Sequence, residues 1–148
     1  MAMLLARARR APLLASARRA LCAASIDLGT YHRLADITIE GVQEVYDEEA
    51  DDDPALAMDV VYADGVLNVV VGERGTFVLN KQAPNMQLWL SSPISGPLRY
   101  NFSSEAAAWH NSRDEHELLT LLAADFEELC GKRLDFGRVA EALREAPS

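Results

Sequence analysis

A series of short β-like segments joined by turns fills the middle of the chain and limits the possible folds more than any other feature. Residues that favour strands concentrate in 58–62, 66–71, 76–82 and 87–91. Two glycine-containing turns, 63–65 and 72–75, separate the first three segments. Short strands joined by such turns predict an antiparallel meander. After a loop over residues 92–97, the segment 98–102 and the neighbourhood of Trp109 add one or two short strands.

Amphipathic helices are expected on both sides of this meander. From Asp27 to about Ala50, apolar or small residues recur at steps of three or four, which predicts one buried helical stripe. This stripe comprises Leu28, Tyr31, Leu34, Thr38, Val42 and Val45. A second helix carries Leu118, Leu122, Phe126 and Leu129 on one face and ends at Gly131. Asp114 and Glu117 resemble a capping box at the start of this helix. The order of elements predicts an α+β domain with two helices packed on one face of an antiparallel sheet.

The first 25 residues differ sharply in charge from the rest of the chain. They are rich in Arg, Ala and Leu and contain no acidic residue, which is typical of an organellar transit peptide. We therefore expect a mitochondrial transit peptide over residues 1–25 and one globular domain over 26–148. A chloroplast or secretory signal and a disordered basic tail are the alternatives. Arg18 and Arg19 argue against the secretory route, because they interrupt the apolar core that such a signal needs.

The remaining domain is strongly acidic. The whole chain carries a formal net charge of -9, and five arginines precede the first acid, Asp27, which leaves -14 for the rest. Nucleic acids and anionic membranes are bound through Lys and Arg, so neither is an expected partner. Cations and basic protein surfaces are favoured instead. Only Cys130 follows the leader, so metals would be bound by oxygen or imidazole ligands rather than by thiolates.

An acidic run follows one side of the first predicted helix, and no basic residue lies between Asp36 and Asp53. We call its central members the acidic ridge: Asp36, Glu40, Glu44, Asp47 and Glu48. Like charges at this spacing repel each other, and the sequence offers no local compensation. A hard cation such as ferrous iron, calcium or magnesium would relieve the repulsion, and the spacing supports only weak, shared sites. A solvated face that merely keeps the protein soluble is the alternative.

The segment 87–91 places Trp89 among polar residues. Period-two alternation directs Leu88 and Leu90 to one side and Trp89 to the other. If residues 83–86 form the hairpin loop, Gln82 faces Gln87 and Asn80 faces Trp89 on one surface. A tryptophan framed by amides predicts an anchor for a protein partner. In the alternative interpretation, Trp89 lies flat and covers the sheet.

The stretch from Gly75 to Pro93, continued by Gly96-Pro97-Leu98-Arg99-Tyr100, resembles the signature of the frataxin family. Weaker similarity extends from Ser25 to about Phe136. The resemblance implies an α-β-β-β-β-β-β-α sandwich, an iron-binding acidic ridge and a sheet surface that docks on the cysteine desulfurase and scaffold complex of iron–sulfur cluster assembly. Carried over by matching positions, the docking residues are Asn80, Gln82, Gln87, Trp89 and Arg99. We call the surface that they form the sheet face.

The resemblance also implies weakly bound ferrous or ferric iron, location in the mitochondrial matrix, and a monomer that iron drives into oligomers. Heme synthesis, through ferrochelatase as a partner, and ferroxidase activity are attributed to the family. The chain departs from the family pattern at Leu28-Gly29, Met86 and Asn101-Phe102. His110 falls near a family histidine implicated in iron contact.

Three functions remain open from the sequence. The first is an accessory protein that promotes iron–sulfur cluster assembly and needs no catalytic residue of its own. The second is a ferroxidase, although the paired Glu-x-x-His motifs of di-iron bundles are absent. The third is an acidic adaptor without a metal function. The chain contains no phosphate-binding loop, nucleophile elbow or metalloprotease helix motif.

Overall fold

The computed structural model describes residues 25–147. The predicted leader, apart from Ser25, therefore lies outside the described residues. The helices and strands follow in the order α1 (Leu28–Asp52), β1 (Met58–Ala63), β2 (Val66–Val71), β3 (Gly75–Gln82), β4 (Gln87–Ser92), β5 (Gly96–Ser103), β6 (Ala108–Asn111), α2 (Leu118–Cys130) and α3 (Gly137–Glu145). Single 3-10 turns occupy Pro54–Leu56 and Ala83–Asn85.

The six strands form one antiparallel sheet in which every strand pairs with its neighbour in the chain, in the order β1-β2-β3-β4-β5-β6. The predicted register is confirmed, because Asn80 pairs with Trp89 and Gln82 pairs with Gln87. The hairpin between β3 and β4 is closed by the 3-10 turn Ala83–Asn85, and Met86 follows it in the left-handed region at φ 50. Each strand thus directs alternate side chains to the same two faces throughout the sheet.

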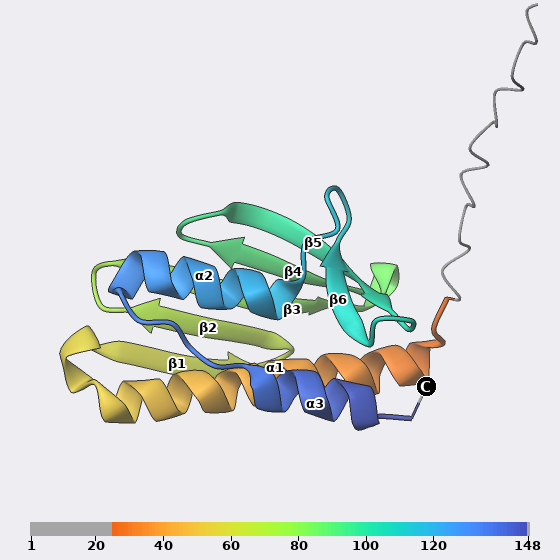
Figure 1. Cartoon of the computed structure of the whole chain (residues 1–148), viewed down its shortest axis with the longest axis horizontal. Coiled ribbons are helices and arrows are strands. Elements are labelled where there is room, and N and C mark those ends of the chain that lie inside the picture. The colour runs from red at the N-terminus through yellow and green to blue at the C-terminus, as the bar shows by residue number, and fades with distance from the viewer. Residues whose placement is uncertain (1–24, 148) are drawn as a thin grey trace, which may run out of the picture.

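Helices cover one face of this sheet, which confirms the predicted α+β architecture (Figure 1). Buried leucines and aromatic residues of the strands meet the apolar stripes of α1 and α2. Leu28, predicted to belong to the stripe of α1, is exposed at the start of the helix. The centre of the core contains an aromatic cluster in which Tyr46 of α1 contacts Phe77, Phe126 and Phe136. Trp109 is fully buried, and its indole nitrogen donates a hydrogen bond to Thr38 Oγ1 at 2.8 Å. This bond fixes α1 relative to β6.

A third helix, α3, lies beside α1 and adds to the two helices predicted from the sequence (Figure 1). It buries Val139 and Leu143. The helices approach closely at Gly41, where an added Cβ would lie 2.8 Å from Cγ2 of Val139. Only a residue without a side chain allows α3 to pack at this distance.

The helix ends follow the sequence with one exception. Asp27 caps α1, since its carboxylate accepts a hydrogen bond from the amide of Thr30, and Gly131 ends α2 in the left-handed region. The capping box predicted at Asp114 is wrong. Glu117 itself is the cap of α2, because its carboxylate accepts hydrogen bonds from the amides of Leu119 and Thr120. Asp114 bonds instead to His116.

Among the residues described, no helix has the length and apolar character required to cross a membrane.

Candidate partner-binding face and acidic ridge

The sheet face lies on the side of the sheet opposite the helices. Cross-strand pairing aligns its residues in two adjacent rows. One row contains Val66, Asn80, Trp89 and Arg99, and the other contains Gln82, Gln87, Asn101 and His110. All five predicted docking residues therefore share one surface. The sequence-based interpretation missed that Asn101 and His110 extend the amide row, because it left the pairing of the last two strands open.

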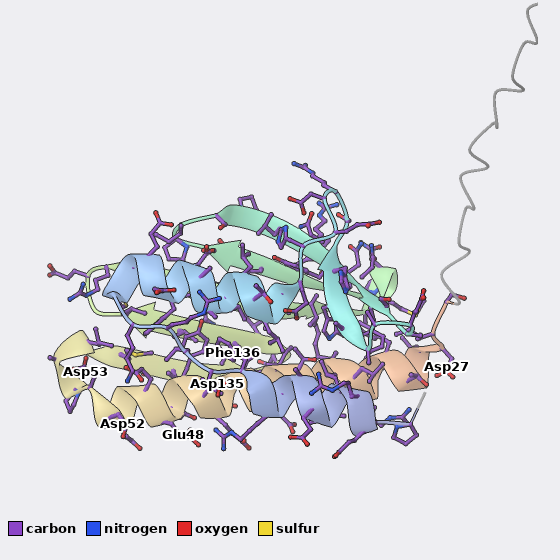
Figure 2. All side chains as sticks on the ribbon, viewed as in Figure 1. Asp27, Glu48, Asp52, Asp53, Asp135 and Phe136 are labelled. Carbon is purple, nitrogen blue, oxygen red and sulfur yellow. The ribbon has the colours of Figure 1, made fainter. Side chains whose placement is uncertain are left out.

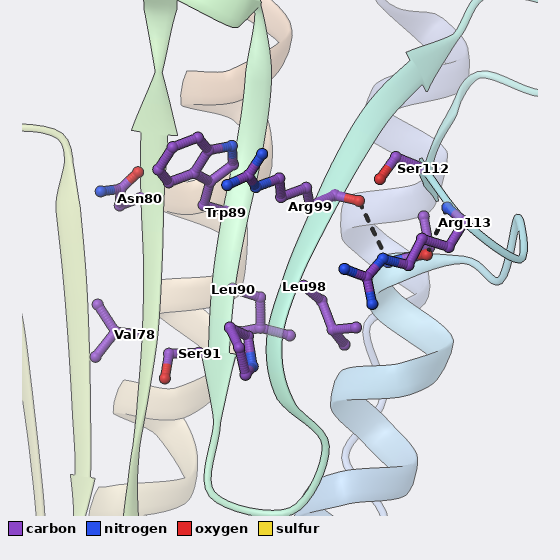
Figure 3. A pocket seen from close by; sticks show the side chains of 11 residues that line it. Val78, Asn80, Trp89, Leu90, Ser91, Leu98, Arg99, Ser112 and Arg113 are labelled. Carbon is purple, nitrogen blue, oxygen red and sulfur yellow. Dashed lines mark hydrogen bonds between the residues drawn. The ribbon is translucent and has the colours of Figure 1, made fainter.

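Neighbouring side chains hold Trp89 in place. Its indole nitrogen donates a hydrogen bond to Oε1 of Gln87 at 3.0 Å, and the amide of Gln87 donates to Oδ1 of Asn101 at 3.0 Å. The guanidinium of Arg99 lies over the indole ring, with Cζ 4.5 Å from the ring centroid (Figure 3). Such a cation–π contact is attractive without burying the charge. The ring thus has a fixed orientation and remains partly exposed.

Asn80 contributes an unused hydrogen-bond acceptor to this surface. Its Oδ1 atom is buried and has no hydrogen-bond partner among the described residues. A groove of about 540 Å³ opens beside it and beside Trp89, and reaches to the loop after β6 (Figure 3). A buried acceptor without a donor is costly, and this one lies next to the groove on the sheet face.

A hydrogen bond and an ion pair connect α1 to the strands that form the sheet face. The hydroxyl of Tyr31 donates a hydrogen bond to the carbonyl of Gln87 at 2.8 Å. Burial raises the pKa of Tyr31 to about 12, so the hydroxyl keeps its proton and remains a donor at neutral pH. Lys81, between Asn80 and Gln82 on β3, extends to the other side of the sheet and pairs with Asp36 of α1 at 2.6 Å.

The acidic ridge follows α1 from Asp36 to Glu48. Glu40, Glu44, Asp47 and Glu48 are exposed, and Asp36 is partly buried. Figure 2 shows Glu48, Asp52 and Asp53 at the far end of the same helix. Asp47 is exposed but loses part of its hydration on the helix surface, and this loss, followed by repulsion from Asp51, raises its pKa above the ordinary value.

The expectation of uncompensated repulsion on α1 is wrong in part, because distant segments bring cations to the acids. Lys81 pairs with Asp36, and Arg138 of α3 pairs with both oxygens of Glu48 at 2.8 and 2.9 Å. Glu49 is buried rather than part of the exposed end, and it accepts a hydrogen bond from Lys132 at 2.6 Å. Three ridge residues, Glu40, Glu44 and Asp47, have no basic partner among residues 25–147.

Among the described residues, the ridge carboxylates form no closed metal cage. Oxygen donors suit ferrous iron, and the three unpaired acids are exposed at helical spacing. Within residues 25–147, no three acidic, histidine or cysteine side chains converge closely enough to hold a metal ion together. Weak, shared metal sites on this helix stay a prediction.

The histidines near the second helix serve other contacts. His110 lies in the amide row of the sheet face, and its Nδ1 bonds to the carbonyl of Glu115 at 2.8 Å. His116 bridges Tyr100 and Asp114, at 2.7 and 2.5 Å. In the described chain, the acidic ridge is formed by carboxylates without histidine.

The fold and these two surfaces define a class of small α+β sandwich in which helices cover one sheet face and leave the other open. The family model of the frataxin-like domain matches residues 24–132. The chain belongs to the frataxin family.

Curated relatives agree with this assignment. The chain is 40% identical over 124 residues to mitochondrial frataxin of Caenorhabditis elegans, with 82% of this chain and 90% of the relative covered. It is 38% identical to the mitochondrial frataxin homolog of Schizosaccharomyces pombe, with 72% of this chain and 67% of the relative covered. With Arabidopsis thaliana mitochondrial frataxin the identity is 41%, covering 69% of this chain and only 54% of the relative.

Solved structures show the same fold. Yeast frataxin matches with a TM-score of 0.63 at 31% identity, covering 72% of this chain and 85% of the yeast chain. A trimeric frataxin from Saccharomyces cerevisiae, complexed with ferrous, matches with a TM-score of 0.60 at 31% identity. The match covers 67% of this chain and 87% of the yeast chain. Frataxin from Psychromonas ingrahamii has a TM-score of 0.61 at 21% identity, which supports the fold alone.

Proposed function

We propose that this protein is an iron-binding accessory factor that promotes iron–sulfur cluster assembly in the mitochondrial matrix. The observation that carries the proposal is the sheet face, where Asn80, Gln82, Gln87, Trp89 and Arg99 form one surface. A fixed aromatic side chain surrounded by amides is typical of a protein-binding anchor. Its partners are the cysteine desulfurase and the scaffold protein of the assembly complex. The relatives named mitochondrial frataxins support the location.

Iron is treated in this proposal as cargo that the acidic ridge binds weakly. Glu40, Glu44 and Asp47 supply oxygen ligands, while Asp36 and Glu48 become available when their cationic partners move. The yeast frataxin complexed with ferrous supports the choice of metal. The trimeric state of that protein supports an oligomer, and its formation from a monomer in response to iron is part of the proposal. Ferrochelatase, as the iron acceptor in heme synthesis, is a further proposed partner of the same loaded ridge.

The test is reconstituted cluster assembly with and without the protein, in which sulfur transfer and iron requirement are measured separately. Trp89→Ala should abolish the stimulation while iron binding persists. Asn68→Ala, on the same face of β2 but outside the groove, is the matched control and should keep the stimulation. Full stimulation by the Trp89 variant would contradict docking through the sheet face.

A ferroxidase is the second candidate, and the unpaired acids of the ridge favour it. Carboxylates of this kind would hold ferrous iron while oxygen accepts its electron. Neutralising Asp36, Glu40 and Glu44 together should then slow iron oxidation. An unchanged oxidation rate in this variant would remove the ferroxidase assignment and leave the accessory function intact.

A further inference from the structure

Two arginines share the groove on the sheet face. Arg99 projects from β5, and Arg113 projects from the loop between β6 and α2 (Figure 3). The residues lining the groove include no carboxylate. The other lining side chains are polar or apolar, so the groove combines positive charge with an apolar floor. The positive charge of the groove contrasts with the net negative charge of the chain, which has 23 acidic and 14 basic residues.

Neither arginine is neutralised within the described chain. Among residues 25–147, Lys81, Lys132, Arg133 and Arg138 each pair with a carboxylate, whereas Arg99 and Arg113, like Arg33, Arg74 and Arg144, do not. The acid next to Arg113 in sequence is Asp114, and its carboxylate accepts hydrogen bonds from both the backbone and the ring of His116. The two guanidinium groups are exposed and available to an external anion.

A buried asparagine fixes the backbone of both arginines. Asn111 is 4% exposed, and its amide nitrogen donates to the carbonyl of Arg99 at 3.3 Å. Its Oδ1 accepts a hydrogen bond from the backbone amide of Arg113 at 2.9 Å. The backbone amide of Ser112 adds a second hydrogen bond to the Arg99 carbonyl, at 2.9 Å. Asn111 thus acts as a positioning residue that orders the loop against β5.

We propose that the groove contains a carboxylate-binding subsite in which Arg113 receives an acidic side chain of the docking partner, while Arg99, over Trp89, adds positive charge to the same groove. The acidic residue belongs to an extended segment in which an apolar residue precedes or follows it. Guanidinium groups bind carboxylates through paired hydrogen bonds, which gives both affinity and orientation. The adjacent apolar residue packs on Trp89, Val78 and Pro97 in the same groove.

Charge complementarity selects this occupant. The molecule as a whole repels anions, so a ligand must present its negative charge locally to reach the arginines. A short acidic segment on an otherwise basic or neutral protein surface meets this condition. Basic residues of a partner would instead be attracted to the acidic ridge on α1. The inference rests on the proposed function, because the partner is the desulfurase–scaffold complex.

The experiment measures the affinity of the full chain for the reconstituted desulfurase–scaffold complex at low and high salt. Arg113→Glu should raise the Kd by about tenfold or more at low salt, with a smaller rise for Arg113→Gln. Added salt should reduce the difference between these variants, because it screens exposed charges. Arg144→Glu, on exposed α3, changes the net charge equally and should leave the Kd unchanged. The thermal unfolding midpoint of each variant shows that the fold is kept.

The outcomes separate the inference from the function on which it rests. If Trp89→Ala abolishes binding and Arg113→Glu leaves it unchanged, the subsite is refuted and the docking function stands. If the unchanged protein does not bind the complex, both are overturned. Binding of free citrate, or self-association, that Arg113→Glu removes without affecting the complex would assign the groove to a small carboxylate or to a second copy. Either result would also overturn the proposal.

Discussion

The indole nitrogen of Trp89 donates a hydrogen bond to the side-chain oxygen of Gln87, two residues earlier on the same strand. Because Gln87 is in turn held by Asn101, the ring is oriented before any partner arrives. Binding then costs less conformational entropy, because the Trp89 side chain is already ordered in the free protein.

We therefore expect Gln87→Ala to weaken binding of the assembly complex by roughly three- to tenfold while leaving the fold intact. Titration calorimetry should show a less favourable entropy of binding. Asn68→Ala provides the matched control on the same face. An unchanged affinity would mean that Arg99 and the strand alone fix the indole.

Removal of the Arg138 guanidinium should strengthen cation binding on the acidic ridge. Arg138 occupies both oxygens of Glu48, so Arg138→Gln frees that carboxylate and removes a positive charge near Glu44. We expect affinity for ferrous iron under anaerobic conditions to increase by roughly two- to fivefold, as for the loss of an exposed charge pair. Arg133→Gln, which breaks the pair with Glu127 on α2, is the control and should have no effect. Equal affinities in the two variants would contradict metal binding at Glu48.

Gly41→Ala should destabilise the protein although alanine favours helices. An alanine in a free helix gains about 1 kcal/mol over glycine. Here the new methyl group would lie 2.8 Å from Val139, and such overpacking costs about 1–3 kcal/mol. We expect a net loss of about 1 kcal/mol in the free energy of unfolding, measured with urea.

The matched test is a double-mutant cycle with Val139→Ala, which removes the clashing atoms. The double variant should be more stable than the sum of the single changes predicts. If Gly41→Ala stabilises the protein, α3 can move away from α1 without a loss in the free energy of unfolding, and the prediction is wrong.

Acid should remove the contribution of the Asp27 cap to stability. Hydrogen bonds from Thr30, first from its backbone amide, hold the pKa of Asp27 below its ordinary value. The folded carboxyl therefore binds its proton less tightly than the unfolded one, so unfolding takes up protons. The stabilisation is fully present above the unfolded pKa of about 4 and is lost as pH falls through the lower folded value.

Asp27→Asn keeps a capping group without the charge and is the appropriate variant. The stability difference from the unchanged protein should be constant near neutral pH and should shrink between about pH 4 and pH 2, in urea unfolding at each pH. If the stability difference is as large at pH 2 as at neutral pH, the charge of Asp27 is not its cause.

Local patterns predicted those parts of the fold that depend on neighbouring residues. The pairing of Asn80 with Trp89 followed from strand alternation and the length of one loop, and the end of α2 followed from Gly131. The third helix was missed because its nine residues bury only Val139 and Leu143, which is too short a stripe to recognise. The capping box was misassigned because two acids three residues apart, Asp114 and Glu117, can each cap a helix, and their spacing does not show which one does.

Electrostatic contacts between distant residues could not be predicted in the same way. Arg138 is 90 residues from Glu48, and Lys81 is 45 residues from Asp36. Arg113 was missed for a related reason, since its role depends on a groove formed by four strands and a loop. Its only signal in the sequence is a single base among Asp114, Glu115 and Glu117.

The strict strand order of the sheet has a kinetic consequence. Each strand pairs with the strand before it, so the sheet can grow hairpin by hairpin through contacts that close short loops. The contacts of α1 behave differently, because Thr38 meets Trp109 across 71 residues and α3 completes its packing near the end of the domain. The docking of the helices therefore carries the entropic cost of closing a long loop. We expect the folding rate of this protein to be limited by the docking of α1 onto a sheet that has already formed.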